Sequence, residues 1–443
     1  MYFRQFRTAV YDNFTQTLLI LISLVIFSKL GITYLSPSGK LAVPESLFSA
    51  SSLGRDLSAY TTLPVYEIRE KKTPFIFGYG SVFVATIVIS TLEQIRVCSP
   101  NEPIACSRIV YQLFVVSSIV LLFLYVYLST QPMHRGIAIL LYIAFILGVP
   151  MNKAIEAGNL DAILACLYGA ILYLSHRFVQ HKYVSQGHAA SIGILMGLLL
   201  SSKAFFLPGI LLAFWSTRKN HSVIVWFIAS FILTAMWPWI YGVRAGVFDV
   251  FAFGVRGSHA FGSQLFTQVN YGNNAIISYI SNALQAVDTG ILPVPVHTAL
   301  TYAISACVFF LIYILPLIQE RVDIRRAYVA SRGWNTVLSA QTLALLYTYA
   351  TVLMLTMTAW SYDYRIVYLV PAVLLLLTLS ENKKTKELLY WSIIMLLLKC
   401  MWIPKDRIMN LFLYVHLYLL IRAAVSLYMD SSRLPIRRGR KTR

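Results

Sequence analysis

Charged residues are scarce in this chain, and acidic ones are the scarcest. Only 12% of its 443 residues are charged, and 37 Lys and Arg stand against 18 Asp and Glu. The sequence also lacks a polar stretch long enough for a soluble domain of ordinary size. No small-residue cleavage site follows the first apolar run, so residues 1–7 and that run indicate a signal anchor and not a cleaved signal peptide. These absences exclude a soluble globular protein.

Cysteine is rare as well, with five residues in the whole chain. Cys166, Cys307 and Cys400 lie in apolar runs and are expected to pack there. Cys98 and Cys106 flank a short polar segment and can form a disulfide if that segment faces an oxidising compartment, a pairing that the sequence leaves open. No cluster of residues demands a metal ion, so we predict neither a metal nor a cofactor.

Apolar runs of membrane-spanning length recur from Thr17 to Leu427, and the chain is 58% hydrophobic with a mean hydropathy of +0.67. They predict an all-α, polytopic membrane protein in which residues 1–443 form a single integral-membrane domain. Much of the net charge of +19 lies in short loops and in the basic tail, residues 428–443. Because cytoplasmic loops are rich in Lys and Arg, this charge predicts contact with anionic membrane lipid, and no nucleic acid partner is expected.

One threading of the chain satisfies the positive-inside rule almost everywhere. The short apolar run 78–92 lies along the outer interface, inside a long first outer loop, residues 36–108. The apolar run 188–215 becomes two short spans that meet at Lys203, and residues 243–298 form a second long outer loop. This gives about twelve transmembrane helices with both termini in the cytoplasm. The other spans are expected near 17–35, 109–129, 136–150, 161–176, 222–242, 299–319, 336–357, 365–380, 388–403 and 408–427.

In this threading, the polar residues that are able to take part in catalysis or binding gather at the outer face. Ionisable groups at membrane depth are functional candidates. The polar residues concerned are Asp56, Tyr60, Glu156, Asn159, Asp161, Lys203, Arg256, His259, Asp363 and Arg365. Structural alternatives stay open for several of them. Asp56 pairs with Arg55 or caps a helix in the plainer interpretation, and Asn159 and Asp161 cap the following span. Arg365 anchors at the interface and His259 is structural in the same interpretation.

Lys203 fits a plain structural role least well. Each arm of its helix pair has about 13–15 residues, or about 20 Å, against a hydrocarbon core of about 30 Å. The turn therefore does not reach bulk water unless the membrane thins or a cavity extends to it. A lysine at that depth needs a counter-charge, and the phosphate of a lipid is a natural one.

Four elements in order resemble the GT-C superfamily of membrane glycosyltransferases. They are GRDLSAY after the first span, the segment TPFIFGYGSVF, the element EAGNLDAILACLYGAILYL, and the small-residue helix with its lysine–aromatic–proline pattern in SSKAFFLPG. The likeness is closest to family 87, the polyprenol-phosphate-mannose-dependent α-mannosyltransferases. It covers Thr17 to Lys219, with a weaker echo at 362–377. The chain departs from the pattern because TPFIFGYG lacks the usual proline after the tyrosine, which puts the acceptor side in doubt.

The resemblance implies an inverting transfer of mannose or another sugar from a polyprenyl-phosphate carrier to a glycan or glycolipid acceptor. Asp56 matches the general base of the family. Lys203 and Arg365, with Arg256 and His259 behind them, would hold the leaving phosphate. Substrate contacts would come from Tyr60, Glu156, Asn159, Asp161 and Asp363. The expected location is a bacterial inner membrane with the site on its outer face. An endoplasmic reticulum location stays open, although no glycosylation sequon lies on the predicted outer face.

Two other functions remain open at this point. One is a transporter or flippase for a lipid-linked or small anionic solute, which many spans and charges at membrane depth also fit. Against it, the two halves of the chain show no internal repeat. The other is an O-antigen polymerase or ligase, which the motif around Asp56 disfavours.

Overall fold

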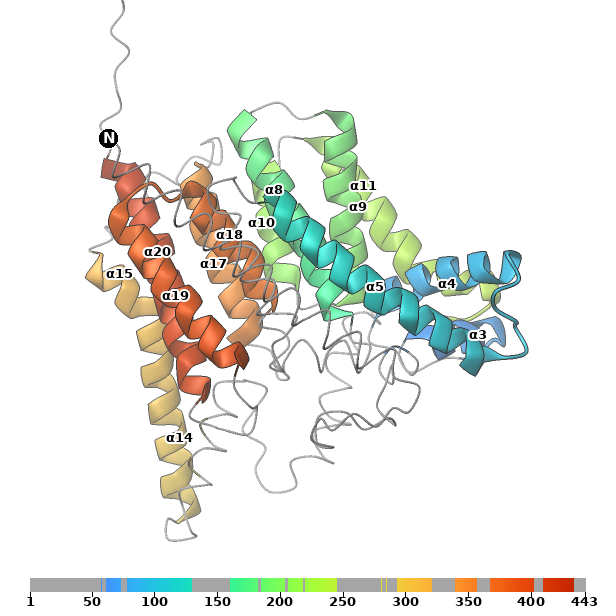
Figure 1. Cartoon of the computed structure of the whole chain (residues 1–443), viewed down its shortest axis with the longest axis horizontal. Coiled ribbons are helices and arrows are strands. Elements are labelled where there is room, and N and C mark those ends of the chain that lie inside the picture. The colour runs from blue at the N-terminus through green and yellow to red at the C-terminus, as the bar shows by residue number, and fades with distance from the viewer. Residues whose placement is uncertain are drawn as a thin grey trace, which may run out of the picture.

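The computed structural model describes residues 57, 61–72, 78–129, 160–181, 185–203, 206–217, 220–244, 280, 284, 293–320, 339–356, 367–401 and 409–433. Within these residues the regular structure is entirely helical (Figure 1). The elements are α3 (Leu63–Arg69), α4 (Tyr79–Gln94), α5 (Pro103–Ser129), α8 (Asp161–His181), α9 (Gln186–Ser202), α10 (Leu207–Thr217), α11 (His221–Met236), η4 (Trp237–Tyr241), α14 (Val294–Phe309), η5 (Phe310–Ile314), α15 (Leu315–Gln319), α17 (Ala340–Thr356), α18 (Leu369–Leu379), α19 (Lys383–Met401) and α20 (Met409–Arg433).

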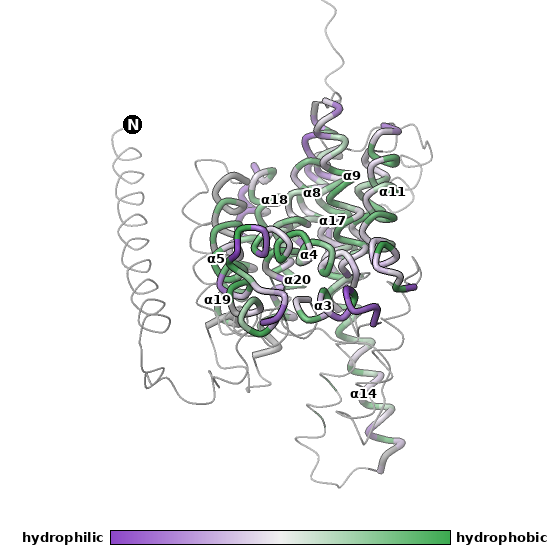
Figure 2. The backbone as a smooth tube through the Cα atoms, turned by 90° about the vertical axis from the view of Figure 1, so that its right-hand side faces the viewer, coloured by the Kyte–Doolittle hydropathy of each residue, from purple (hydrophilic) through white to green (hydrophobic). Residues whose placement is uncertain are grey.

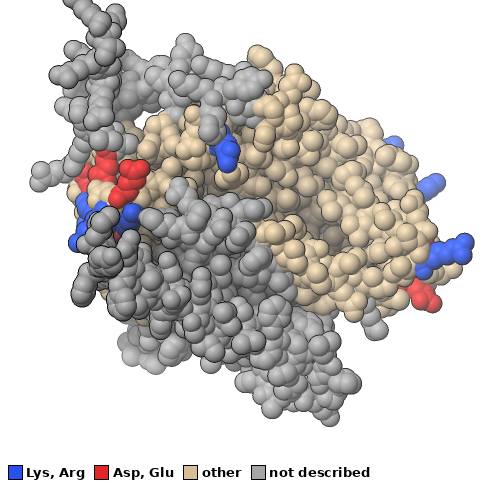
Figure 3. Space-filling view, turned by 45° about the horizontal axis from the view of Figure 1, so that its top comes forward, with Lys and Arg blue, Asp and Glu red and all other residues tan. Residues whose placement is uncertain are grey.

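The helices have the character of a membrane protein, as the composition predicts. Among the described residues, four segments are long and apolar enough to cross a bilayer: Ile163–Gln180, His221–Tyr241, Pro295–Gln319 and Phe412–Asp430. Figure 2 shows long apolar stretches along the helices, with hydrophilic residues mostly toward helix ends and loops. On the face drawn in Figure 3, the charged side chains of the described residues gather mainly at two opposite edges, and the described surface between them carries few charges. Such a distribution suits a body whose middle lies in hydrocarbon and whose ends lie in water.

The chain doubles back at Lys203. Helices α9 and α11 run side by side in the same direction, because Gly193 lies against Val223 to Phe227 and Gly197 lies against Phe227 to Phe231. Further along the same pair, the Thr234 hydroxyl donates to Ser201 Oγ at 2.7 Å. Because α9 ends at the far end of this pair and α11 begins again at the near end, α10 must run back between them. The prediction of two short helices that meet at Ser201–Ser202–Lys203 is therefore confirmed.

Two glycines allow the close approach of α9 and α11. A Cβ atom at Gly193 would lie 2.5 Å from the Val223 carbonyl oxygen, and one at Gly197 would lie 2.7 Å from the Phe231 nitrogen. Ser201, four residues further, continues the same row of small side chains. Membrane helices associate through such rows, since van der Waals packing replaces the hydrophobic effect between apolar helices in lipid.

The described helices pack around two hydrophobic cores. The main core joins α8, α9, α10, α17, α18, α19 and α20, and its largest fully buried side chains include Tyr168, Tyr347, Tyr368 and Phe206. The side core joins α3, α4, α5 and η4, and it also buries Leu57. In Figure 1, α4 runs almost crosswise to the steep helices α9 and α11. The predicted apolar run 78–92 is thus a helix of the side core, and at 16 residues it is shorter than the spanning helices.

Candidate functional site

Three helix ends bring a lysine, an aspartate and a tyrosine together. Asp161 lies in the first turn of α8, Lys203 follows the last residue of α9, and Tyr368 precedes the first residue of α18. The Lys203 Nζ lies 2.8 Å from Asp161 Oδ1, and the Tyr368 hydroxyl donates to the same oxygen. The Asp161 side chain has no exposed surface and that of Lys203 is 16% exposed. These three residues are called the Lys203 cluster below.

Local sequence explains why the polar groups stand at helix ends. A carboxylate in the first turn of a helix is stabilised by the positive end of the helix dipole, which favours Asp161 where it stands. Helix α9 ends because Lys203 takes an extended backbone conformation, although its N–H still donates to the Leu199 carbonyl at 2.9 Å. The chain then needs only a short turn before α10, since the Phe206 N–H donates to the Lys203 carbonyl at 3.3 Å.

An aromatic group adjoins the Lys203 cluster through Tyr368. The Phe206 ring lies edge-on to Tyr368 with centroids 5.2 Å apart, and the Tyr168 ring lies 5.6 Å from Phe206. The Tyr168 hydroxyl is 3.0 Å from Thr351 Oγ1 on α17, so its polar end is satisfied inside the main core. Gly209 makes room for this ring, because a Cβ there would lie 2.5 Å from Tyr168 Cε2. The group fixes α8, α10, α17 and α18 around the ion pair.

The start of α4 contacts the end of α9 directly beside Lys203. Gly78 packs on the Ser202 carbonyl and Gly80 on the Ser201 side chain so tightly that neither position has space for a Cβ atom. The Trp237 indole N–H donates to the Tyr79 carbonyl at 3.3 Å and ties α4 to η4. The amino ends of α4, α8, α10 and α18 therefore all lie around the end of α9. Each contributes a partial positive charge, in addition to the lysine.

The helices that lead away from the Lys203 cluster differ in length. Helix α18 leads away from it through 11 residues, or about 16 Å, to the start of α19. Helix α9 approaches it through 17 residues, or about 25 Å. Both lengths fall short of the hydrocarbon core of about 30 Å, whereas α8, which starts at Asp161, has 21 residues and extends about 31 Å.

The ion pair changes one expectation from the sequence. The counter-charge of Lys203 was expected from a lipid phosphate, and the chain supplies it through Asp161. The reason is that α8 and α9 run antiparallel, so the first residue of one helix meets the end of the other. Asp161, predicted as a substrate contact or a cap, is the ion-pair partner.

Most of the predicted site residues lie outside the described residues, namely Asp56, Tyr60, Glu156, Asn159, Arg256, His259, Asp363 and Arg365. The two that are described, Asp161 and Lys203, lie 42 positions apart in the sequence and are in direct contact. Tyr368 was not singled out from the sequence. Its only signal was a hydroxyl-bearing side chain in an apolar run, five residues after the predicted Asp363.

The side core contains the two cysteines whose pairing the sequence leaves open. Cys98 and Cys106 form a disulfide across the turn between α4 and α5, with Cα atoms 5.0 Å apart. The Arg69 guanidinium holds both oxygens of Glu93 at 2.8 and 3.0 Å, which joins α3 to α4. Burial and, secondarily, the charge of Glu93 raise the pKa of the Tyr66 phenol beside Arg69, so the arginine faces a neutral ring.

The comparisons with known proteins identify no family. No protein-family model matches the sequence, and neither curated proteins nor solved structures give a match. Within the described part of the chain, no three His, Cys, Asp or Glu side chains gather closely enough to hold a metal ion. The Lys203 cluster is therefore the starting point for the function.

Proposed function

We propose that the chain is an inverting membrane glycosyltransferase of the GT-C type, which transfers a sugar from a polyprenyl phosphate to a glycan or glycolipid acceptor. The observation that carries the proposal is the Lys203 cluster. A lysine stands at the meeting point of two short helices, among the amino ends of four helices. Such a place favours an anion that a lipid carries into the membrane.

The proposed chemistry is a single displacement at the anomeric carbon. An acceptor hydroxyl attacks that carbon, its proton passes to a carboxylate, and the bond to the polyprenyl phosphate oxygen breaks on the opposite face. The carboxylate is assigned to Asp56 by the family resemblance. Leu57, the next residue in the sequence, is buried in the side core, to which α4 and Trp237 also belong. Leu57, which follows Asp56, therefore lies in the same core as α4, the helix that starts beside Lys203.

The leaving phosphate gains negative charge as the bond breaks, so groups that strengthen their contact at that stage accelerate the reaction. Lys203 is assigned this role, with Arg365, Arg256 and His259 as further donors. An ammonium group has three N–H donors, so Lys203 can contact a phosphate oxygen without leaving Asp161. Asp161 and Tyr368 would then position the lysine, because together they fix its place between α8, α9 and α18.

The proposed topology has about twelve spans and places the disulfide outside the cytoplasm, on the same side as the site. Structural disulfides persist in oxidising compartments, and the turn that Cys98 and Cys106 close connects α4, which starts beside Lys203, to α5. A bacterial inner membrane with the site facing the periplasm satisfies both conditions. The test uses single cysteines in a background without Cys166, Cys307 and Cys400. Asn101→Cys should react with an impermeant thiol reagent on intact cells and Lys383→Cys only after permeabilisation, and the reverse pattern would refute the topology.

A transporter remains the second candidate, and one observation favours it. The Asp161–Lys203 pair is a buried ion pair in an apolar helical bundle, and ionisable groups of this kind also mark the substrate sites of transporters. The two functions differ in what happens to the bond between sugar and phosphate. A transferase breaks it, whereas a transporter delivers the donor intact.

The deciding experiment supplies the purified protein with radiolabelled polyprenyl-phosphate sugars and envelope glycolipid acceptors. The proposal expects label in the acceptor and free polyprenyl phosphate, with Asp56→Asn losing at least about a hundredfold of the transfer rate, as loss of a general base predicts. Glu67→Gln, in α3, is the matched control with a carboxylate removed from the same loop. Intact donor recovered on the opposite side of proteoliposomes would support the transporter instead.

A further inference from the structure

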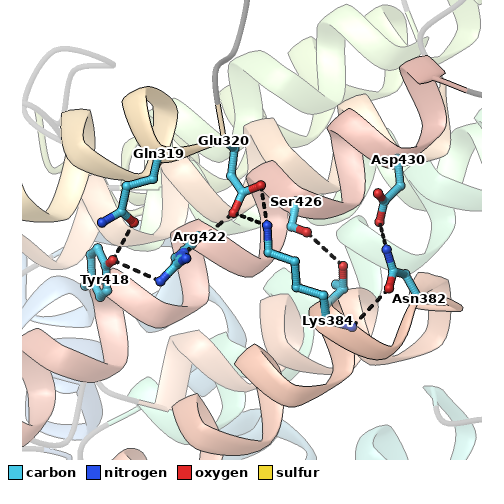
Figure 4. Close-up of polar contacts among 9 residues, drawn as sticks. Gln319, Glu320, Asn382, Lys384, Tyr418, Arg422, Ser426 and Asp430 are labelled. Atoms are coloured by element: carbon cyan, nitrogen blue, oxygen red, sulfur yellow. Dashed lines mark hydrogen bonds and ion pairs between the residues drawn. The ribbon is translucent and has the colours of Figure 1, made fainter.

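The end of the bundle opposite the Lys203 cluster carries a second buried carboxylate. Glu320 follows α15, its side chain is 8% exposed, and it lies between α19 and α20 (Figure 4). Lys384 Nζ donates to both Glu320 oxygens, at 2.7 and 2.6 Å. One ammonium therefore neutralises this carboxylate and occupies both of its oxygens.

Arg422 adds a second positive charge beside the same carboxylate. Its Nε lies 3.6 Å from Glu320 Oε1, too far for a hydrogen bond, and its Nη1 donates to the Tyr418 hydroxyl at a long 3.3 Å. That hydroxyl in turn donates to Gln319 Oε1 at 2.6 Å. Among the described residues, no other hydrogen bond of the Arg422 guanidinium is found, although this group has five N–H donors. Lys384, Arg422 and Glu320 together leave one positive charge.

The position of Arg422 makes this charge unusual. It lies inside the apolar span Phe412–Asp430, two helical turns before its end, and its side chain is 30% exposed. The other charges at this end are arranged differently. Lys383, which is 91% exposed, pairs with Glu387 at 3.8 Å in water-facing positions, and Asp430 accepts from the Asn382 amide at 2.8 Å. Of the remaining described neighbours, Glu381 is exposed and Lys386 is partly exposed.

An exposed apolar stripe leads up to the same place. Leu311, Ile314 and Ile318 are exposed at spacings of three and four residues along η5 and α15, and the stripe ends one residue before Gln319. An acyl chain lying along this stripe would bring its headgroup to the height of Tyr418 and Arg422. Arginine suits a phosphate there, since its planar fork binds two oxygens and is weakly hydrated.

We propose that Arg422, with Tyr418 and Lys384, binds the phosphate of an anionic phospholipid in the leaflet at this end of the bundle. The lipid would satisfy a guanidinium that the protein leaves with few partners, while its chain covers the Leu311–Ile318 stripe. This site is independent of the proposed sugar transfer, because it lies at the other end of α18 from Lys203.

The test is native mass spectrometry of the whole protein released from nanodiscs that contain phosphatidylcholine and phosphatidylglycerol. The wild type should retain phosphatidylglycerol in preference, and Arg422→Gln should weaken this retention about tenfold, as expected for loss of a charge-assisted hydrogen bond. Lys383→Gln removes one positive charge from the same end and should retain the lipid like the wild type. Arg422→Lys should bind at an intermediate level, which separates lost binding from misfolding.

Three outcomes would overturn the proposal. The wild type could show no preference for phosphatidylglycerol, or Arg422→Gln and Lys383→Gln could lose the lipid equally, which would indicate general charge attraction. In a parallel arm, glycerol phosphate is titrated against the protein in a neutral detergent. Thermal stabilisation that depends on Arg422 in that arm, without lipid retention in nanodiscs, would assign the site to a soluble phosphate.

Discussion

Two lysine–carboxylate pairs mark the two ends of the described bundle, and they differ in burial. Asp161 and Lys203 are 0% and 16% exposed, whereas Glu320 and Lys384 are 8% and 51% exposed. The first pair joins the ends of three helices in the interior of the bundle, and the second joins three helices where its lysine is half exposed. An ion pair removed from water depends on its partner far more than one that solvent still reaches. Loss of one charged partner should therefore reduce stability more at the Lys203 end than at the Glu320 end.

Removal of the Asp161 charge should cause the largest loss of stability. Asp161→Asn removes the buried carboxylate that faces the Lys203 ammonium, and breaking a buried pair in this way costs about 3–5 kcal/mol of unfolding free energy. The measurement is reversible unfolding in one detergent, with Glu320→Gln as the matched change at the other end, where a smaller loss is expected.

A double variant sharpens this prediction. Asp161→Asn with Lys203→Met removes both charges, and it should recover most of the stability that the single change loses. If the double variant is as unstable as Asp161→Asn, the instability does not come from the charge of Lys203.

Disturbing the packing of α9 on α11 should cause the next largest loss of stability, because this packing holds the turn at Lys203 in place. Gly197→Leu forces side-chain atoms into a space where even a Cβ would lie 2.7 Å from Phe231, and overpacking costs about 1–3 kcal/mol. The control is Gly187→Leu in the first turn of α9, where the nearest atom to a Cβ is Ser185 Oγ at 3.9 Å. Equal thermal midpoints for the two variants would contradict the close contact.

The smallest losses of stability are expected at the end of the bundle that carries Glu320. Lys384→Gln should cost about 1 kcal/mol, since solvent and Arg422 still compensate Glu320. Lys383→Gln should leave the thermal midpoint unchanged, because its pair with Glu387 is exposed on both sides. A loss for Lys384→Gln as large as that for Asp161→Asn would remove the difference between the two ends.

The positions of most described helices could be predicted from apolar runs and basic loops, whereas the predicted spans 17–35 and 136–150 lie outside the described residues. The reversal at Ser201–Ser202–Lys203 followed from basic residues at both ends of one apolar stretch, and the α9–α11 contacts confirm it. The pairing of Lys203 with Asp161 could not be predicted, because it depends on how α8 lies against α9, and sequence spacing does not encode that. Tyr368 was missed for the same reason. Its hydroxyl reaches Asp161 only because α18 starts beside α8 in the folded protein.

The most direct test of the proposed function measures donor use by a protein whose Lys203 cluster is neutral but intact in shape. Asp161→Asn with Lys203→Gln should fold with near-wild-type stability and lose at least about a hundredfold in kcat/KM for the polyprenyl-phosphate sugar, since the phosphate loses its charged donor. A folded double variant that transfers sugar at the wild-type rate would contradict the assignment of the phosphate to Lys203.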